Sequence, residues 1–185
     1  MSAQPSAHHP RRVRVVGTSG AGKTTFARRL ARTLDVPHVE LDEVFWGPGW
    51  VKRDPAEARA DLRARLAGPA WVADGNWDST AGDALDAADT VVWLDHPRRV
   101  VMARVVRRTL YRGALRVTLW HGNRERLATL LRRDPHENIV LWAWTSHARV
   151  RDRWAGRTGQ PGPAVVRLSG PRAARRWLRT LERPR

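Results

Sequence analysis

Gly17-Thr18-Ser19-Gly20-Ala21-Gly22-Lys23-Thr24 is the stretch that decides how the rest of this sequence is interpreted. It fits the phosphate-binding pattern G-x-x-x-x-G-K-[ST] at every specified position. Backbone N–H groups in such a loop, and the start of the helix behind it, favour negative charge. We therefore expect residues 17–24 to hold a polyphosphate, with Lys23 reaching its β and γ phosphates and Thr24 offering a hydroxyl to Mg²⁺.

The residues on either side of this loop supply the context that the pattern requires. Val13, Val15 and Val16 form a short β-branched run directly before the loop, as a buried parallel strand would. After the loop, apolar residues from Phe26 to Leu34 recur at helical spacing, with arginines on the other side. The pattern thus predicts a strand, a phosphate-binding loop and a helix in succession.

Further strands and helices alternate along the remaining chain. We expect strands at 38–41, 71–73, 90–94 and 164–168, and helices at about 54–67, from 97 onward, from 134 to about 154, and after 171. Alternation of this kind predicts an α/β fold in which a five-stranded parallel sheet is covered on both faces. Ligands bind beyond the carboxyl ends of such strands, where Asp42, Asp74 and Asp95 are expected. Converging carboxylates near a polyphosphate again indicate Mg²⁺, although Asp95 before His96-Pro97 fits a helix N-cap better.

Length and composition bound the class of protein. With 185 residues, the chain suits a single domain over 11–185, preceded by a disordered tail at 1–10. The chain has no cysteine, so disulfides and thiolate metal sites are excluded. We find neither a signal peptide nor a membrane-spanning run, and the simplest expectation is a cytoplasmic protein without membrane contact.

The charge of the chain is strongly positive, at +16, and nearly all of it comes from arginine. Lys23 and Lys52 are the only lysines. A lysine at the loop position therefore suggests that a compact ammonium is needed there. A basic balance attracts nucleotides, nucleic acids and acidic surfaces alike, and does not choose among them.

Several segments together resemble P-loop kinases of the adenylate kinase type, in particular the group labelled DNA topology modulation proteins. The matching segments are GTSGAGKTTFARRLA, VPHVELDEVFWGPGW, WVADGNW, ADTVVWLDHPRRVVMARVVRR, GNRE and VVRLSGPRAARRWL. The resemblance implies a three-layer P-loop fold similar to that of nucleoside monophosphate kinases. It also implies an acceptor-binding insert at 42–69 and an arginine-rich lid at about 111–124.

The same resemblance implies roles for individual residues. The donor ATP would contact the loop and the neighbouring Thr25, and its adenine would rest near Ser169 to Arg172. Asp74, in Ala73-Asp74-Gly75, would orient Mg²⁺ through water. Asp42 would position or deprotonate an acceptor hydroxyl, or only orient the substrate if the acceptor is a phosphate. The lid arginines that would clamp the transferring phosphoryl group are Arg104, Arg108 and Arg112, with Arg149 and Arg153 as later candidates.

The aromatic and histidine residues allow more than one interpretation. Trp46 and Trp50 could sandwich a planar substrate, or they could staple the insert to the core. Trp142 and Trp154 fit the core better than a ligand site. His121 and His136 have no partners at metal-binding spacing, and we expect them on the surface.

The function that these residues favour is ATP-dependent phosphoryl transfer to a nucleotide or another small molecule, with Mg²⁺. The alternative is a nucleic-acid-binding regulator that binds ATP without kinase activity, favoured by the charge and by the arginine-rich 98–133 region. No recognition module for nucleic acid is evident. A nucleotide-dependent switch or ATPase is a third reading, and the chain could act as a monomer or a homodimer.

Overall fold

The computed structural model describes residues 10–182, and a five-stranded parallel sheet forms its centre. The strands lie in the order β2-β3-β1-β4-β5, with helical segments crossing over between successive strands. Their bounds are β1 (Arg12–Val16), β2 (His38–Glu40), β3 (Trp71–Asp74), β4 (Thr90–Leu94) and β5 (Ala164–Leu168). The predicted α/β class and the five parallel strands are confirmed.

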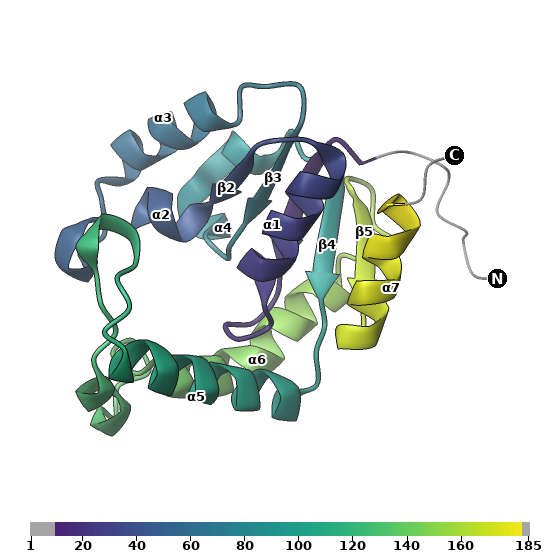
Figure 1. Cartoon of the computed structure of the whole chain (residues 1–185). Coiled ribbons are helices and arrows are strands. Elements are labelled where there is room, and N and C mark those ends of the chain that lie inside the picture. Colours follow the sequence, from purple (N-terminus) through teal and green to yellow (C-terminus); the bar gives the residue numbers. More distant parts are fainter. Residues whose placement is uncertain (1–9, 183–185) are drawn as a thin grey trace.

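Helices cover both faces of the sheet and cross below its carboxyl edge. The α-helices are α1 (Lys23–Leu34), α2 (Leu41–Phe45), α3 (Pro55–Arg65), α4 (Asp78–Ala81), α5 (Arg98–Ala114), α6 (Ile139–Ala155) and α7 (Pro171–Glu182). Short 3₁₀ turns are η1 (Pro48–Trp50), η2 (Gly82–Leu85), η3 (Trp120–Gly122) and η4 (Leu127–Leu131). In Figure 1, α5 and α6 run beneath the ends of the strands, opposite the start of α1.

Apolar packing on each face of the sheet fixes the helices in place. On one face, Phe26 and Leu30 of α1 and Leu178 of α7 pack against Val13 and Val15. On the other face, Trp154 of α6 packs on a buried patch of β1 and β4 that includes Trp93. Burying one such large side chain contributes about 1.5–3 kcal/mol. The start of α1, and with it the phosphate loop, is therefore held rigidly at the carboxyl edge.

The helix after β2 and η1 begins where its sequence signature predicts. Asp54 caps α3, because its Oδ1 accepts hydrogen bonds from the backbone N–H groups of Ala56 and Glu57 at 2.9 and 3.0 Å. Pro55 occupies the first turn, where a missing N–H costs nothing. Residues 42–69 thus contain most of α2, together with η1 and α3.

The first residues of the predicted lid, 111–114, belong to the end of α5. Two expected boundaries are wrong. The sequence predicts that Leu41 ends the second strand, but β2 stops at Glu40 and Leu41 begins α2. The expected helix start at Asp134 forms only a turn, in which the Asp134 carboxylate accepts from His136 N at 2.8 Å. Asn138, four residues later, caps α6 instead, through Val140 N and Leu141 N.

Two further expectations concern the ends and the surroundings of the chain. The tail predicted at 1–10 lies, apart from Pro10, outside the described residues. Between residues 10 and 182, no helix has the length and apolar character needed to cross a bilayer.

Candidate functional site

The phosphate loop, residues 17–24, has the backbone that its glycines allow. Gly20 and Gly22 have φ values of 87° and 89°, a left-handed region that L side chains rarely adopt. A Cβ on Gly20 would lie 2.8 Å from the backbone oxygen of Val101 in α5. The loop is therefore shaped by glycine and packed directly against α5.

Lys23 begins α1, and its ammonium points back over the loop. Its Nζ donates hydrogen bonds to Gly17 O at 3.0 Å and to Thr18 O at 3.4 Å. Burial lowers the pKa of Lys23, while the carboxylates of Asp42 and Asp74 oppose that shift. The carboxylates thus favour the charged form of Lys23, and a charged ammonium that is short of water attracts an incoming phosphate.

Thr24 and Asp74 meet at the end of β3, as the sequence predicts for a Mg²⁺ site. Thr24 Oγ1 donates to Asp74 Oδ2 at 2.8 Å, and Asp74 is only 3% exposed. The other carboxylate oxygen of Asp74 lies 2.8 Å from His38 Nε2, in β2. A hydroxyl beside a buried carboxylate is an oxygen donor set of the kind Mg²⁺ uses together with phosphate and water. The residues present therefore fit this ion.

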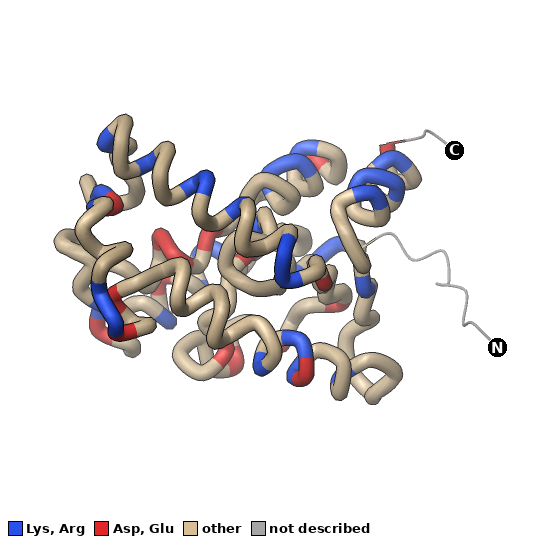
Figure 2. Tube along the Cα trace, turned by 90° about the horizontal axis from the view of Figure 1, so that it is seen from below, with Lys and Arg blue, Asp and Glu red and all other residues tan. Residues whose placement is uncertain are grey.

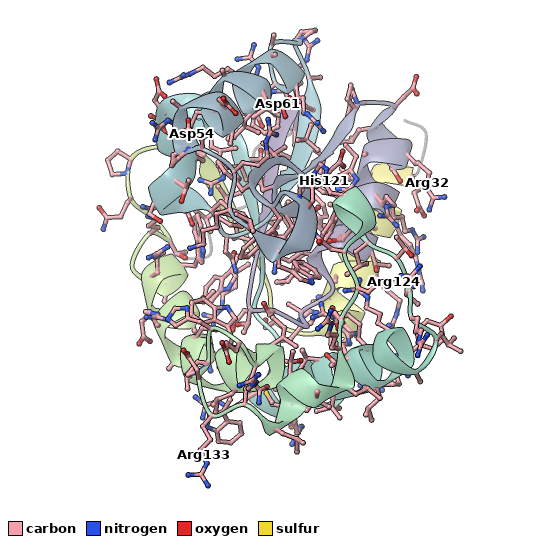
Figure 3. The ribbon with its side chains drawn as sticks, turned by 90° about the vertical axis from the view of Figure 1, so that its left-hand side faces the viewer. Arg32, Asp54, Asp61, His121, Arg124 and Arg133 are labelled. Atoms are coloured by element: carbon pink, nitrogen blue, oxygen red, sulfur yellow. The ribbon has the colours of Figure 1, made fainter. Side chains whose placement is uncertain are left out.

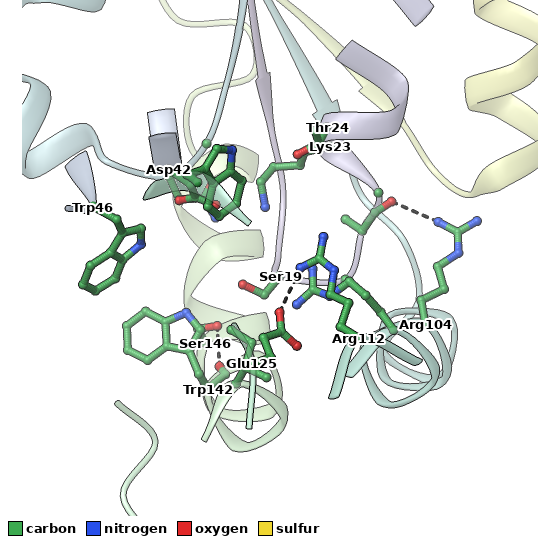
Figure 4. Close-up of a pocket in the computed structure, with 18 of the residues that line it drawn as sticks. Ser19, Lys23, Thr24, Asp42, Trp46, Arg104, Arg112, Glu125, Trp142 and Ser146 are labelled. Carbon is green, nitrogen blue, oxygen red and sulfur yellow. Dashed lines mark hydrogen bonds and ion pairs between the residues drawn. The ribbon is translucent and has the colours of Figure 1, made fainter. Parts of the chain in front are cut away.

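Asp42 lies on α2, opposite Lys23, and its orientation is set by the segment after β3. Trp77 Nε1 donates to Asp42 Oδ1 at 2.7 Å. The neighbouring Asn76 donates through Nδ2 to Gly17 O at 2.7 Å, which ties this segment to the phosphate loop. Figure 4 shows the Asp42 carboxylate and the Lys23 ammonium facing each other across the cavity. The Oδ2 of Asp42 accepts no hydrogen bond within residues 10–182 and is free for a ligand.

The three predicted lid arginines share one face of α5, because their spacing of four residues matches the helical turn. Arg104 Nη1 donates to Ala21 O of the phosphate loop at 2.9 Å. Arg112 Nη1 pairs with Glu125 Oε1 at 2.8 Å. Between them, burial lowers the pKa of Arg108, and its Nε lacks a partner among the described residues. All three arginines line the cavity beside the loop. Figure 4 shows Arg104 and Arg112 there.

Residues 115–126 form a hairpin that is closed by a bridge between Thr118 and Arg124. This hairpin packs on the insert. Asn123, only 4% exposed, donates to Gly47 O at 2.9 Å and accepts from Trp50 N at 3.1 Å. Trp120 Nε1 donates to Glu40 Oε2 at 3.0 Å, at the end of β2. In Figure 3, His121 and Arg124 lie between α5 and α3, the helix that Asp54 caps and that carries Asp61.

Sequence reasoning missed His38, Asn123 and Glu125 as parts of the site. His38 is a titratable residue at the start of a strand whose neighbour β3 ends in Asp74, a signal that could have been noticed. Glu125 is the only acidic residue from 96 to 133, and its Oε2 is buried without a partner in the described part of the chain. Asn123 carries no such signal, because asparagine beside glycine usually marks only a turn.

Several predicted contacts lie elsewhere. Asp95 neither caps α5 nor joins the other carboxylates, since it pairs with Arg167 of β5 at 2.5 and 2.8 Å. Ser169 and Arg172 are exposed and lie outside the cavity lining. The lining residues of α7 are instead Pro171, Ala174, Arg175 and Leu178, which share one helix face.

The aromatic residues divide between core and cavity. Trp154 is buried in the core as expected, but Trp142 lines the cavity and its ring lies 5.3 Å from that of His136. Trp46 contacts Trp77 and Trp50 edge to face, at 5.3 and 6.0 Å between ring centres. His121 is exposed, and its Nε2 lies 2.9 Å from Glu43 O. Trp46 and Trp50 both line the cavity, and Trp50 is also fastened to the hairpin through Asn123 and Arg124.

One cavity of about 2290 Å³ joins all these elements. Its lining is basic: Lys23, Lys52 and many arginines face it, against the carboxylates of Asp42, Glu125 and Glu137. Other arginines are spread over several helices, including a run along α7 (Figure 2). The cavity is thus suited to anionic ligands.

Comparisons with known proteins agree with this geometry. A family model described as an AAA domain, AAA_33, matches residues 13–181. The shikimate kinase from Acinetobacter baumannii, solved in complex with shikimate, is 19% identical with a TM-score of 0.52 and covers 92% of this chain and 90% of its own. A gluconokinase from Sinorhizobium meliloti 1021 is 18% identical with a TM-score of 0.52 and covers 94% of each chain.

A sugar kinase from a Janibacter species is 20% identical with a TM-score of 0.50 and covers 94% of this chain and 91% of its own. At these identities the likeness concerns the fold, which is that of small-molecule P-loop kinases. The family match extends over most of the sequence. The protein therefore belongs to the AAA domain family AAA_33.

Proposed function

We propose that the protein transfers the γ-phosphoryl group of ATP to a hydroxyl group of a small molecule. The observation that carries the proposal is the placement of the Asp42 carboxylate opposite Lys23, at the open end of the phosphate loop (Figure 4). Phosphoryl transfer needs positioning and neutralisation of charge more than covalent chemistry. A base on one side and a cation on the other meet that need.

In the proposed reaction, the acceptor oxygen attacks the γ-phosphorus and the bond from that phosphorus to the β–γ bridging oxygen breaks. ADP leaves with the bonding electrons. The proton of the acceptor hydroxyl passes to the free oxygen of Asp42, which Trp77 holds in place through its hydrogen bond to Oδ1. If the acceptor is instead the phosphate of a nucleotide, Asp42 only orients it.

Thr24 and Asp74 would hold Mg²⁺, Thr24 directly and Asp74 through water. When bound, this ion would neutralise phosphate charge and orient the β and γ phosphates. The hydrogen bond between Thr24 and Asp74, and the contact of Asp74 with His38, keep these oxygens in position. The remaining negative charge of the transferring group would be met by Lys23, Arg108 and Arg112.

We further propose that the 115–126 hairpin serves as the lid and that the insert at 42–69 binds the acceptor. The contacts of Asn123 and Trp120 with the insert support this assignment, because they close one side of the cavity to water. The adenine of ATP would lie at the α7 end of the cavity, near Pro171 and Arg175 rather than beside Ser169 and Arg172.

A nucleic-acid-binding regulator remains the second candidate, and the charge of +16 is the observation that favours it. This candidate would also agree with the resemblance to the DNA topology modulation group. The basic residues attract a nucleic-acid backbone without reading its sequence. Yet the most desolvated cations, Lys23 and Arg108, line the same cavity as the phosphate loop and Asp42, which favours a phosphorylated small molecule there.

Two assays on the wild type and Lys23→Ala separate these functions. The first measures acceptor-dependent release of ADP from MgATP over a panel of hydroxylated compounds and nucleotides. The second measures DNA binding as a function of salt concentration. We expect Lys23-dependent phosphoryl transfer and DNA binding that weakens steeply with salt. The kinase proposal fails if no acceptor is phosphorylated while tight DNA binding persists at raised salt and survives the substitution.

A further inference from the structure

One face of α6, the helix that follows the proposed lid, lines the cavity. Trp142, Ser146, Arg149 and Arg153 all line the cavity, and their spacing places them on one face of α6. This helix is outside the insert at 42–69 that the sequence assigns to the acceptor. The cavity that would hold the acceptor is therefore lined by α6 as well as by the insert.

Arg149 differs from the other arginines near it. Its guanidinium carbon lies 5.6 Å from the centre of the Trp142 ring, a stacking distance that holds it over the indole. Arg153 pairs with Asp78 at 3.3 Å, and Arg151, on another face of α6, pairs with Asp95 at 3.5 Å. Within residues 10–182, Arg149 has no carboxylate within ion-pair distance. It therefore presents an uncompensated charge to the cavity.

The ATP phosphates already have cations of their own. Lys23 and the phosphate loop lie at one side, and Arg104, Arg108 and Arg112 approach from α5. Figure 4 shows Arg104 and Arg112 on the far side of Lys23 from Trp46 and Trp142. A cation fixed on Trp142 is thus placed for the acceptor rather than for the nucleotide.

The aromatic rings around Asp42 complete this side of the cavity. Trp77 holds Asp42 by its indole N–H and contacts Trp46 edge to face at 5.3 Å. Trp46 and Trp142 come from the insert and from α6, and both face the cavity (Figure 4). Indole surfaces favour the apolar face of a ring or a carbon chain, with polar groups at its ends.

We propose that the acceptor is a hydroxylated compound that also carries an anionic group, a carboxylate or a phosphate, and that Arg149 stacked on Trp142 binds this group. The inference rests on the proposed kinase function, since Asp42 marks the end of the acceptor where the hydroxyl lies. A guanidinium holds both kinds of anion through two parallel hydrogen bonds, which a neutral side chain cannot replace. Arg149 is therefore a specificity-determining residue for the acceptor.

Calorimetry on the full chain saturated with MgADP tests this without any turnover. The probes are two matched pairs, gluconate with glucose for a carboxylate, and uridine monophosphate with uridine for a phosphate. We expect the anionic member of one pair to bind roughly 10- to 100-fold more tightly than its neutral partner, as charge-assisted hydrogen bonds imply. The pair that shows this preference tells carboxylate from phosphate.

Three variants assign the preference to Arg149. Arg149→Gln should abolish it, and Arg149→Lys should restore it in part, because the charge returns without the planar fork. Arg151→Gln changes the same charge on the same helix outside the cavity and should keep the preference. Equal or undetectable binding of both anions, or a preference that survives Arg149→Gln, overturns the inference. If the protein phosphorylates an uncharged acceptor in preference to anionic ones, the inference about Arg149 is overturned while the kinase function stands. If it prefers anions but transfers no phosphoryl group to any compound, the kinase function alone is contradicted.

Discussion

Replacing Asp42 by asparagine removes the proposed base with almost no change in shape. The asparagine side-chain oxygen can still accept the hydrogen bond that Trp77 Nε1 donates to Oδ1 at 2.7 Å. The variant side chain therefore stays beside Lys23, but it carries no charge and cannot take a proton from the acceptor. The structure of α2 and the phosphate loop should be unaffected.

The expected cost follows from the role of a positioned base. General base catalysis contributes roughly 10²- to 10⁴-fold, so kcat should fall by that factor, which corresponds to about 3–5 kcal/mol of transition-state stabilisation. Binding of MgATP should change little, because Asp42 lies on the acceptor side of Lys23. Steady-state kinetics with a phosphorylated acceptor gives kcat, and calorimetry gives the affinity for the nucleotide.

Asp83→Asn is the matched control, since Asp83 is exposed, lies outside the cavity and pairs with Arg63 on the surface. It should retain the kcat of the wild type. The reasoning is refuted if Asp42→Asn keeps kcat within about threefold of the wild type, because a catalytic base is worth far more than that. It is equally refuted if the two variants lose activity alike.

Three further predictions concern the metal site, the lid and a buried histidine. Asp74→Asn should raise the Mg²⁺ concentration needed for half-maximal MgADP binding by roughly 10- to 100-fold, and an unchanged Mg²⁺ titration in calorimetry would argue against the site. Asn123→Ala removes the hydrogen bonds to Gly47 and Trp50. It should destabilise the fold by about 1–3 kcal/mol and speed proteolytic cleavage of the 115–126 hairpin. Cleavage at the wild-type rate would contradict the packing of this hairpin on the insert. Burial lowers the pKa of His96 from 6.5 to about 4, so the unfolded state binds more protons between these pH values and the free energy of unfolding should rise with pH across them, by up to about 3 kcal/mol. In denaturant titrations His96→Gln should lose this contribution, and an equal pH slope in the variant and the wild type would rule it out.

The parts of the fold that the sequence predicts are those with local causes. The glycines of the phosphate loop specify its backbone shape within eight positions, and the valines before it form β1. The cavity-facing arginines of α5 follow from helical spacing alone. The position of Asp74 beside Thr24 follows from the rule that parallel strands end at one edge.

The parts that could not be predicted depend on contacts between distant residues. No local pattern indicates that Asn123 contacts Gly47, or that Asp95 at the end of β4 pairs with Arg167 of the neighbouring β5. An excess of arginine adds to the difficulty, because many partners of equal chemistry compete for each carboxylate. At the start of α6, Asp134 and Asn138 both have capping character, and the residue next to the apolar run forms the cap.

The most direct test of the central claim is mass spectrometry of a mixture of hydroxylated metabolites incubated with MgATP and the protein. The account predicts that a compound bearing both a hydroxyl and an anionic group gains one phosphoryl group with the wild type, and that the product is absent with Lys23→Ala and strongly reduced with Asp42→Asn. If ATP is hydrolysed by the wild type while no compound in the mixture gains a phosphoryl group, the protein is not the kinase described here.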